Sequence, residues 1–194
     1  MDKTTEKTAV AAVAIMLILA IVFPTMLSDP LQFAIAAAVS VAIALSVQKP
    51  VRKKIRHVVF DVGGVLLKGD YFTQQLSEMP GTKDVIKQLK KKGYKVDVLS
   101  NNNAIATDAI TKHFKYNDLF DKTISSSDVG AQKPHPDSFN KMLAMINAGA
   151  DEIVFVDDTP GNVEAAKKLG IKAVEFKSAA QLREELKRMG VDVD

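Results

Sequence analysis

The 194-residue sequence contains no cysteine and only three histidines. Without cysteine the chain has neither a disulfide framework nor a thiolate metal site. The histidines, His57, His113 and His135, are scattered along the chain and lack the spacing of a zinc site. A metal centre in this protein is therefore expected to use oxygen ligands.

The sequence also lacks the basic stripe on a folded domain that nucleic-acid binding requires. Residues 1–57 carry seven Lys and Arg against three Asp and Glu, whereas the remaining residues carry 19 against 20. The net charge of +3 thus belongs to the N-terminal segment, and the rest of the chain is nearly neutral. We expect no nucleic-acid partner.

Two long runs without a charged residue cover residues 8–27 and 31–47. A helix of about 20 residues crosses the roughly 30 Å hydrocarbon core of a bilayer, and the Ser-Asp-Pro sequence between the runs is typical of a turn. Residues 1–50 are therefore predicted to form a transmembrane hairpin of two helices. A secretory signal peptide would have a shorter apolar region and a small-residue cleavage site, and no other part of the chain could bury two apolar helices.

Basic residues flank the predicted hairpin at both of its ends, near the N-terminus and in the polybasic linker at residues 51–57. Because Lys and Arg remain on the cytoplasmic side, both termini of a multi-pass membrane protein are expected in the cytoplasm. The linker would also attract anionic membrane lipids. The alanine-rich second run permits close helix packing, including packing between copies in a homo-oligomer.

Beyond residue 57 the pattern changes to short apolar runs that alternate with amphipathic segments. Strands are expected at 58–62, 96–100, 122–125, 153–156 and 172–176, and helices at 81–92, 104–113, 137–148, 162–169 and 179–189. This alternation predicts an α/β domain over residues 58–194 with a doubly wound parallel sheet. Such sheets bind ligands outside the carboxyl ends of their strands.

Polar residues stand at that edge after four of the predicted strands: Asp61, Ser100, Lys133 and the pair Asp157 and Asp158. A buried strand that ends in an acid is costly unless the acid is paired or holds a metal. Taken singly, the aspartates could cap turns or helices, the serine could belong to a capping loop, and the lysine could be solvated. Together they indicate one site, in which three converging carboxylates suit a hard cation such as Mg²⁺.

In their order and context these residues resemble the motifs of the haloacid dehalogenase superfamily of phosphohydrolases. The segments are Asp61-Val-Gly-Gly-Val65, Val98-Leu-Ser-Asn101, Lys133-Pro-His-Pro-Asp137 and the Asp157-Asp158 pair. The resemblance covers about residues 56–176, which is nearly all of the predicted α/β domain.

The resemblance implies a role for each of the matching residues. Asp61 would be the nucleophile and would form an aspartyl phosphate. Ser100, Asn101 and Lys133 would bind the phosphoryl group and neutralise its charge. The ligands of Mg²⁺ would be Asp61, Asp157 or Asp158, and the backbone carbonyl of Gly63.

The sequence departs from the family pattern at Gly63, where phosphatases of the family usually carry a second aspartate that acts as general acid and base. A glycine offers no proton, and general acid–base catalysis typically contributes about 10²–10⁴-fold. Substrates whose leaving groups need little protonation, such as acyl or anomeric phosphates, would be least affected. His135 could serve as the acid, but its position between two prolines favours a structural role.

Family members usually carry a cap domain after the first or second motif, and this chain has no room for one. Residues 68–79 leave space for a loop or one short helix, so the site is expected to be open. The sequence thus predicts a membrane-anchored, Mg²⁺-dependent phosphohydrolase that acts on a phosphorylated substrate. The alternatives are a catalytically weak module that binds Mg²⁺ or a phosphorylated ligand, or an assembly element formed by the hairpin.

Overall fold

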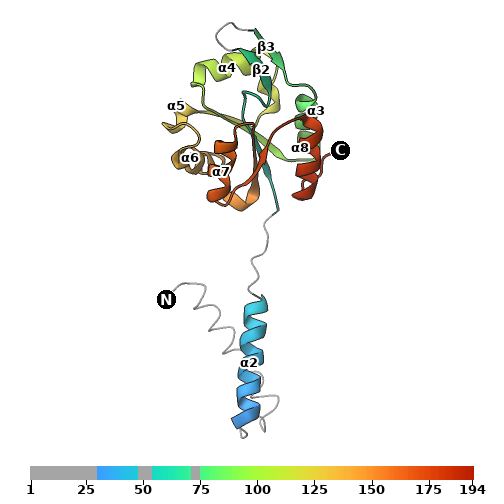
Figure 1. Cartoon of the computed structure of the whole chain (residues 1–194), viewed down its shortest axis with the longest axis vertical. Coiled ribbons are helices and arrows are strands. Elements are labelled where there is room, and N and C mark those ends of the chain that lie inside the picture. The colour runs from blue at the N-terminus through green and yellow to red at the C-terminus, as the bar shows by residue number, and fades with distance from the viewer. Residues whose placement is uncertain (1–29, 48–53, 71–74) are drawn as a thin grey trace. The chain divides into compact units, whose positions relative to one another are not determined.

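The computed structural model describes residues 30–47, 54–70 and 75–194 (Figure 1). The chain divides into two units, residues 1–52 and 53–194. Helix α2, Pro30–Val47, belongs to the first unit and coincides with the second of the two predicted apolar helices. The first of them, at residues 8–27, and residues 51–53 of the polybasic linker lie outside the described residues.

Helix α2 contains no charged residue, and it exposes Leu31, Ile35, Val39 and Val41. The hydroxyl of Ser40, which is buried, donates to the carbonyl of Ala36 at 2.7 Å, so this polar group is satisfied within the helix. Of the helices that the structure describes, none combines the length and the apolar character needed to cross a membrane.

The second unit is built on five parallel strands in the order β5-β4-β1-β6-β7. The strands are β1 (His57–Phe60), β4 (Lys95–Ser100), β5 (Lys122–Ser125), β6 (Ile153–Asp157) and β7 (Lys172–Glu175). All four residues of β1 and all five of β6 are buried, as expected for central strands covered on both faces. The predicted α/β class and parallel sheet are therefore confirmed.

Helices cover both faces of this sheet. They are α3 (Thr82–Lys91), α4 (Ala104–His113), α5 (Ser126–Val129), α6 (Pro136–Ile146), α7 (Pro160–Lys168) and α8 (Ala179–Arg188), with 3₁₀ turns at Asn117–Leu119 and Ala150–Glu152. Side chains of α3 and α8 pack with Val58 and Phe60 of β1, whereas those of α6 and α7 pack with Val59. Successive residues of a strand point to opposite faces, so β1 serves both halves of the core.

The segment after β1 differs from the prediction. Instead of a loop or a short helix, β2 (Leu67–Asp70) and β3 (Gln75–Glu78) form an antiparallel two-stranded sheet of their own. Gly69, with a φ of 120°, lies directly opposite Leu76, and a Cβ on it would come within 2.0 Å of the carbonyl oxygen of Gln75. This hairpin lies beside the carboxyl ends of the main strands (Figure 1).

Candidate active site

The candidate site lies where the neighbouring strands β1 and β6 end. Phe60 pairs with Val156 in the register of the two strands, so Asp61 and Asp157 follow at the same level. The backbone N–H of Asp61 continues the pairing and donates to the carbonyl of Val156 at 2.8 Å. Asp61 and Asp157 are about a hundred residues apart in the sequence, and they lie side by side at the carboxyl edge of the sheet.

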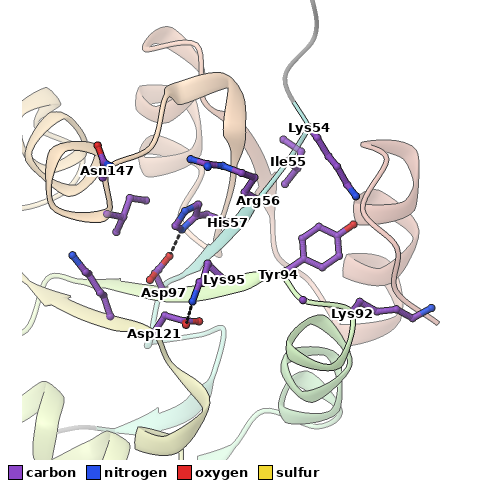
Figure 2. Close-up of a pocket in the computed structure, with 13 residues that line it drawn as sticks. Lys54, Ile55, Arg56, His57, Lys92, Tyr94, Lys95, Asp97, Asp121 and Asn147 are labelled. Carbon is purple, nitrogen blue, oxygen red and sulfur yellow. Dashed lines mark hydrogen bonds and ion pairs between the residues drawn. The ribbon is translucent and has the colours of Figure 1, made fainter.

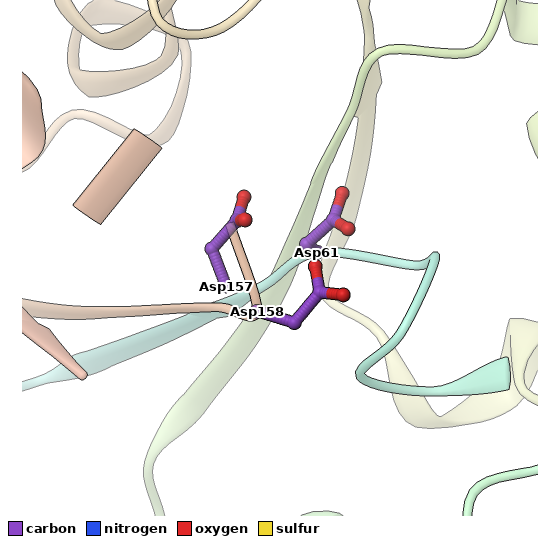
Figure 3. Close-up of side chains that lie close together, drawn as sticks. All are labelled: Asp61, Asp157 and Asp158. Carbon is purple, nitrogen blue, oxygen red and sulfur yellow. The ribbon is translucent and has the colours of Figure 1, made fainter. Parts of the chain in front are cut away.

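Three carboxylates meet at this edge (Figure 3). One oxygen each of Asp61, Asp157 and Asp158 lies within 4.8 Å of the others. Burial raises the pKa of Asp61 to about 6, with the nearby Asp157 adding to the shift and Lys133 opposing it. Burial and the charge of Asp157 likewise raise the pKa of Asp158. A divalent cation would remove this repulsion, and carboxylate oxygens are the ligands that Mg²⁺ prefers, so the donor set fits Mg²⁺.

Lys133 places a positive charge between two of these carboxylates. Its Nζ donates to Oδ1 of Asp61 at 2.6 Å and to Oδ2 of Asp157 at 2.7 Å. The side chains of Lys133 and Asp157 are essentially inaccessible, and that of Asp61 is 14% exposed. Buried charges of this kind persist only when they are paired. The structure therefore brings the predicted nucleophile and the predicted phosphate-binding lysine into direct contact.

The two acids of the pair have different surroundings. Asp157 accepts from Lys133, from the backbone N–H of Thr159 at 2.9 Å and, with both oxygens, from Nδ2 of Asn162 at 3.0 and 3.1 Å. Asp158 is exposed, and its Oδ1 accepts from the hydroxyl of Thr159 at 3.4 Å. Asp157 therefore holds Lys133 in position, and Asp158 is the more accessible oxygen donor for a cation.

Asp158 approaches the turn after β1 at Gly64. A Cβ added to Gly64 would lie 1.9 Å from Oδ2 of Asp158. The φ of Gly64 is 70°, in the left-handed region that favours glycine. Gly63, by contrast, is not among the described glycines with positive φ. Gly64 therefore gives Asp158 its room beside Asp61, whereas Gly63 places no special demand on the backbone.

The loop after β4 supports Lys133. Asn101 accepts from the backbone N–H of Lys133 with Oδ1 at 2.8 Å and donates to its carbonyl with Nδ2 at 3.0 Å. Because this amide is engaged, the predicted phosphate contact of Asn101 would use its backbone N–H. Ser100 is buried at the end of β4, where its hydroxyl accepts from the N–H of Asn102 at 3.1 Å.

Sequence reasoning missed Asn162, which orients Asp157 from the first turn of α7. The signal that could have found it is an amide five residues after the first acid and two residues after Pro160, which starts the helix. His135 takes the structural role expected of it. Its Nδ1 accepts from the N–H of Asp137 at 3.2 Å at the start of α6, and its side chain is 62% exposed.

A pocket of about 610 Å³ opens at the opposite, amino edge of the sheet (Figure 2). On its wall Nδ1 of His57 and Oδ2 of Asp97 are 2.7 Å apart, which ties the start of β1 to β4. Burial raises the pKa of Asp97, and its hydrogen bond with His57 opposes the shift. None of the predicted site residues lines this pocket, so the chemistry of the motifs does not take place there.

Comparisons with known proteins concern the family and the fold of this chain. The family model described as haloacid dehalogenase-like hydrolase matches residues 38–176. Glyceraldehyde 3-phosphate phosphatase of Pyrococcus abyssi is 32% identical over 103 residues, which are 53% of this chain and 43% of that protein. Pyrophosphatase PpaX of Bacillus cereus is 26% identical over 103 residues, 53% of this chain and 48% of that protein. The chain thus spans less than half the length of these relatives.

Solved structures share the fold at lower identity. A haloacid dehalogenase phosphatase from Thermococcus onnurineus has a TM-score of 0.61 and 18% identity over 69% of this chain and 98% of its own. A family enzyme from Bacteroides thetaiotaomicron, in complex with magnesium and inorganic phosphate, has a TM-score of 0.54 and 23% identity. The match covers 64% of this chain and 95% of that enzyme's chain. Both likenesses extend over almost the whole of the solved chains.

Proposed function

Because the chain belongs to the haloacid dehalogenase-like hydrolase family, we propose that it is a Mg²⁺-dependent phosphoric-monoester hydrolase with Asp61 as nucleophile. The observation that carries the proposal is the contact of Lys133 with both Asp61 and Asp157, beside a third carboxylate on Asp158. Relatives named as phosphatases and a fold neighbour that binds magnesium and phosphate support it.

In the proposed reaction, an Asp61 oxygen attacks phosphorus while the bond from phosphorus to the leaving oxygen breaks. The leaving group departs with that electron pair, and water then attacks the aspartyl phosphate, which releases phosphate and restores Asp61. Lys133 neutralises charge on the phosphoryl oxygens, and the hydroxyl of Ser100 donates to one of them. Asp61, Asp158 and the carbonyl of Gly63 would hold Mg²⁺, which supplies further neutralisation of the phosphoryl group when bound.

The activity is tested with the full chain by measuring phosphate release from acetyl phosphate, an aryl phosphate and a sugar 1-phosphate, with and without Mg²⁺. We expect release that requires Mg²⁺ and is fastest with acetyl phosphate, whose leaving carboxylate needs no proton.

A second candidate function is a module that binds a phosphorylated ligand without turnover. Gly63 favours this candidate because a glycine offers no proton to the leaving group. Tight binding of phosphate analogues together with no release from any substrate would select that candidate.

Replacing Gly63 with aspartate is expected to speed the hydrolysis of an alkyl phosphate, such as glycerol 3-phosphate, by about 10²–10⁴-fold, because it supplies the missing general acid. Acetyl phosphate should change by no more than a few fold. The matched control is Gly63→Asn, which has a similar size and no acidic proton. Equal acceleration of both substrates, or of both variants, would refute the idea that leaving-group protonation limits this enzyme.

We further propose that residues 8–27 and 31–47 anchor the protein at a membrane with both termini in the cytoplasm, where the polybasic linker contacts anionic lipid. Support comes from the two charge-free runs of the sequence and from the exposed aliphatic side chains of α2. After alkaline carbonate washing, the full chain should stay with the membrane pellet, and a double variant with Ile35→Glu and Val39→Glu should leave it in larger part. Complete extraction of the unaltered chain would refute the anchor.

A further inference from the structure

Helix α4 buries two threonines and leaves an isoleucine exposed. Its buried residues are Thr107 and Thr111, whose hydroxyls donate back to carbonyls of the same helix, to Asn103 at 2.9 Å and to Asp108 at 3.1 Å. Ile105, in contrast, is 84% exposed. Ile110, about one and a half turns further on, is partly buried and packs against the core, as expected for a helix that covers the sheet. The exposed side of α4 therefore carries one isoleucine that the core does not use, beside the ion pair of Asp108 and Lys112.

A groove runs along this helix. Ala106, Ala109, Ile110 and His113 follow one another at helical spacing on its wall, and Leu76 of β3 lies on the opposite side. The small alanine side chains leave a pocket of about 510 Å³, which is the size of a small-molecule site and not that of a flat protein interface. In Figure 1 the β2–β3 hairpin lies beside α4 at the same end of the domain.

The groove is linked to the candidate active site through Asn102, whose backbone N–H donates to the hydroxyl of Ser100 at 3.1 Å. Asn102 lines the groove, and its neighbour Asn101 holds the backbone of Lys133, whose Nζ contacts Asp61. Asn103 then caps α4, so the helix leads away from the loop that supports the catalytic lysine. The far end carries His113 and Phe114, whose rings meet edge to face at 4.8 Å.

We propose that this groove binds an aliphatic chain on the leaving group of the substrate while the phosphoryl group sits at Asp61. The inference rests on the proposed function and narrows its substrate class. Gly63 favours leaving groups that need no proton, and the groove favours apolar ones, which together describe an acyl phosphate with an aliphatic chain. Hydrolysis would break the bond from phosphorus to the acyl oxygen, and the fatty carboxylate would leave with the electron pair.

Binding can be tested without turnover by titrating the full chain with hexylphosphonate and methylphosphonate in the presence of Mg²⁺, because their carbon–phosphorus bond is not hydrolysed. We expect hexylphosphonate to bind about tenfold more tightly or better, since each buried methylene adds to the affinity. Ala109→Lys should remove this preference and leave methylphosphonate unchanged. Ala180→Lys, the same change at an exposed position of α8, should preserve it.

The turnover of hexanoyl phosphate and acetyl phosphate, whose leaving groups are about equally acidic, is compared in the same three proteins: the unaltered chain, Ala109→Lys and Ala180→Lys. The proposal that the groove binds the aliphatic chain would be overturned if the two phosphonates bound with equal affinity or if neither bound. It would also be overturned if Ala109→Lys weakened the binding of both phosphonates equally. If sedimentation showed that the unaltered chain dimerises and that Ala109→Lys does not, the groove would be assigned to a second copy of the chain. That result would also overturn the proposal. A preserved chain-length preference without any turnover would refute the phosphohydrolase and leave the groove in place.

Discussion

Replacing Asp61 with asparagine is expected to lower Mg²⁺-dependent phosphate release by about 10⁴-fold or more, because the variant has no carboxylate that can attack phosphorus. The substitution preserves the shape of the side chain and an oxygen that can still accept from Lys133, which now contacts Oδ1 of Asp61 at 2.6 Å. The loss should therefore appear in turnover and not in folding. Release of phosphate from acetyl phosphate and a thermal melt of the same preparation measure the two effects.

A matched control is Asp121→Asn, at the opposite end of the sheet. Asp121 also accepts from lysines, Lys90 at 2.6 Å and Lys95 at 2.9 Å, and those hydrogen bonds hold its pKa at about 2 against the opposing effect of burial. Removing its charge should cost some stability and leave turnover unchanged. Full turnover in Asp61→Asn, or an equal loss in Asp121→Asn, would contradict a nucleophilic role for Asp61.

The core of this site could be predicted from the sequence because buried strands leave a strong signal. A run of three or four apolar residues that ends in an acid, as before Asp61 and Asp157, is costly to bury unless the acid is paired or binds a cation. Once the strands are taken as parallel, their carboxyl ends must share one edge, so the convergence of the acids with Lys133 follows from topology. The contact of Lys133 with both carboxylates is the outcome of that reasoning.

The β2–β3 hairpin could not be predicted in the same way. Its strands contain two apolar side chains, the buried Leu67 of β2 and the partly buried Leu76 of β3, and their other residues are polar or glycine, so no alternation of apolar and polar residues marks them. Their pairing depends on the close approach that Gly69 permits. The short helix α5 was missed for a related reason, since it is fixed by the hydrogen bonds between Ser125 and Asp128 and not by an apolar face.

The arrangement around Asp157 could also not be predicted from the sequence, because it depends on side-chain geometry. The paired acids look equivalent along the chain, yet Asp157 is surrounded by donors and Asp158 is exposed. The difference follows from the alternation of a strand. Asp157 is the last residue of β6 and points into the domain, and Asp158 begins the loop and turns toward Gly64.

Replacing Lys133 with methionine is expected to destabilise the protein by about 3–5 kcal/mol, because it leaves Asp61 and Asp157 close together without a countercharge. The same change should lower phosphate release by about 10³-fold, the magnitude seen when one group that stabilises a transition-state charge is removed. Mg²⁺ should recover part of the lost stability, since a cation at the carboxylates reduces their repulsion. Urea denaturation with and without Mg²⁺ measures this recovery directly.

Lys141→Met provides the comparison for this prediction, because Nζ of Lys141 donates to a backbone carbonyl, that of Val129 at 2.6 Å. The described structure shows no carboxylate contact for Lys141, so its loss should cost only about 1 kcal/mol and should not respond to Mg²⁺. If both variants lost the same stability and neither responded to Mg²⁺, the charge of Lys133 would not be what holds the carboxylates together. A response confined to Lys133→Met would show that metal and lysine neutralise the same carboxylates.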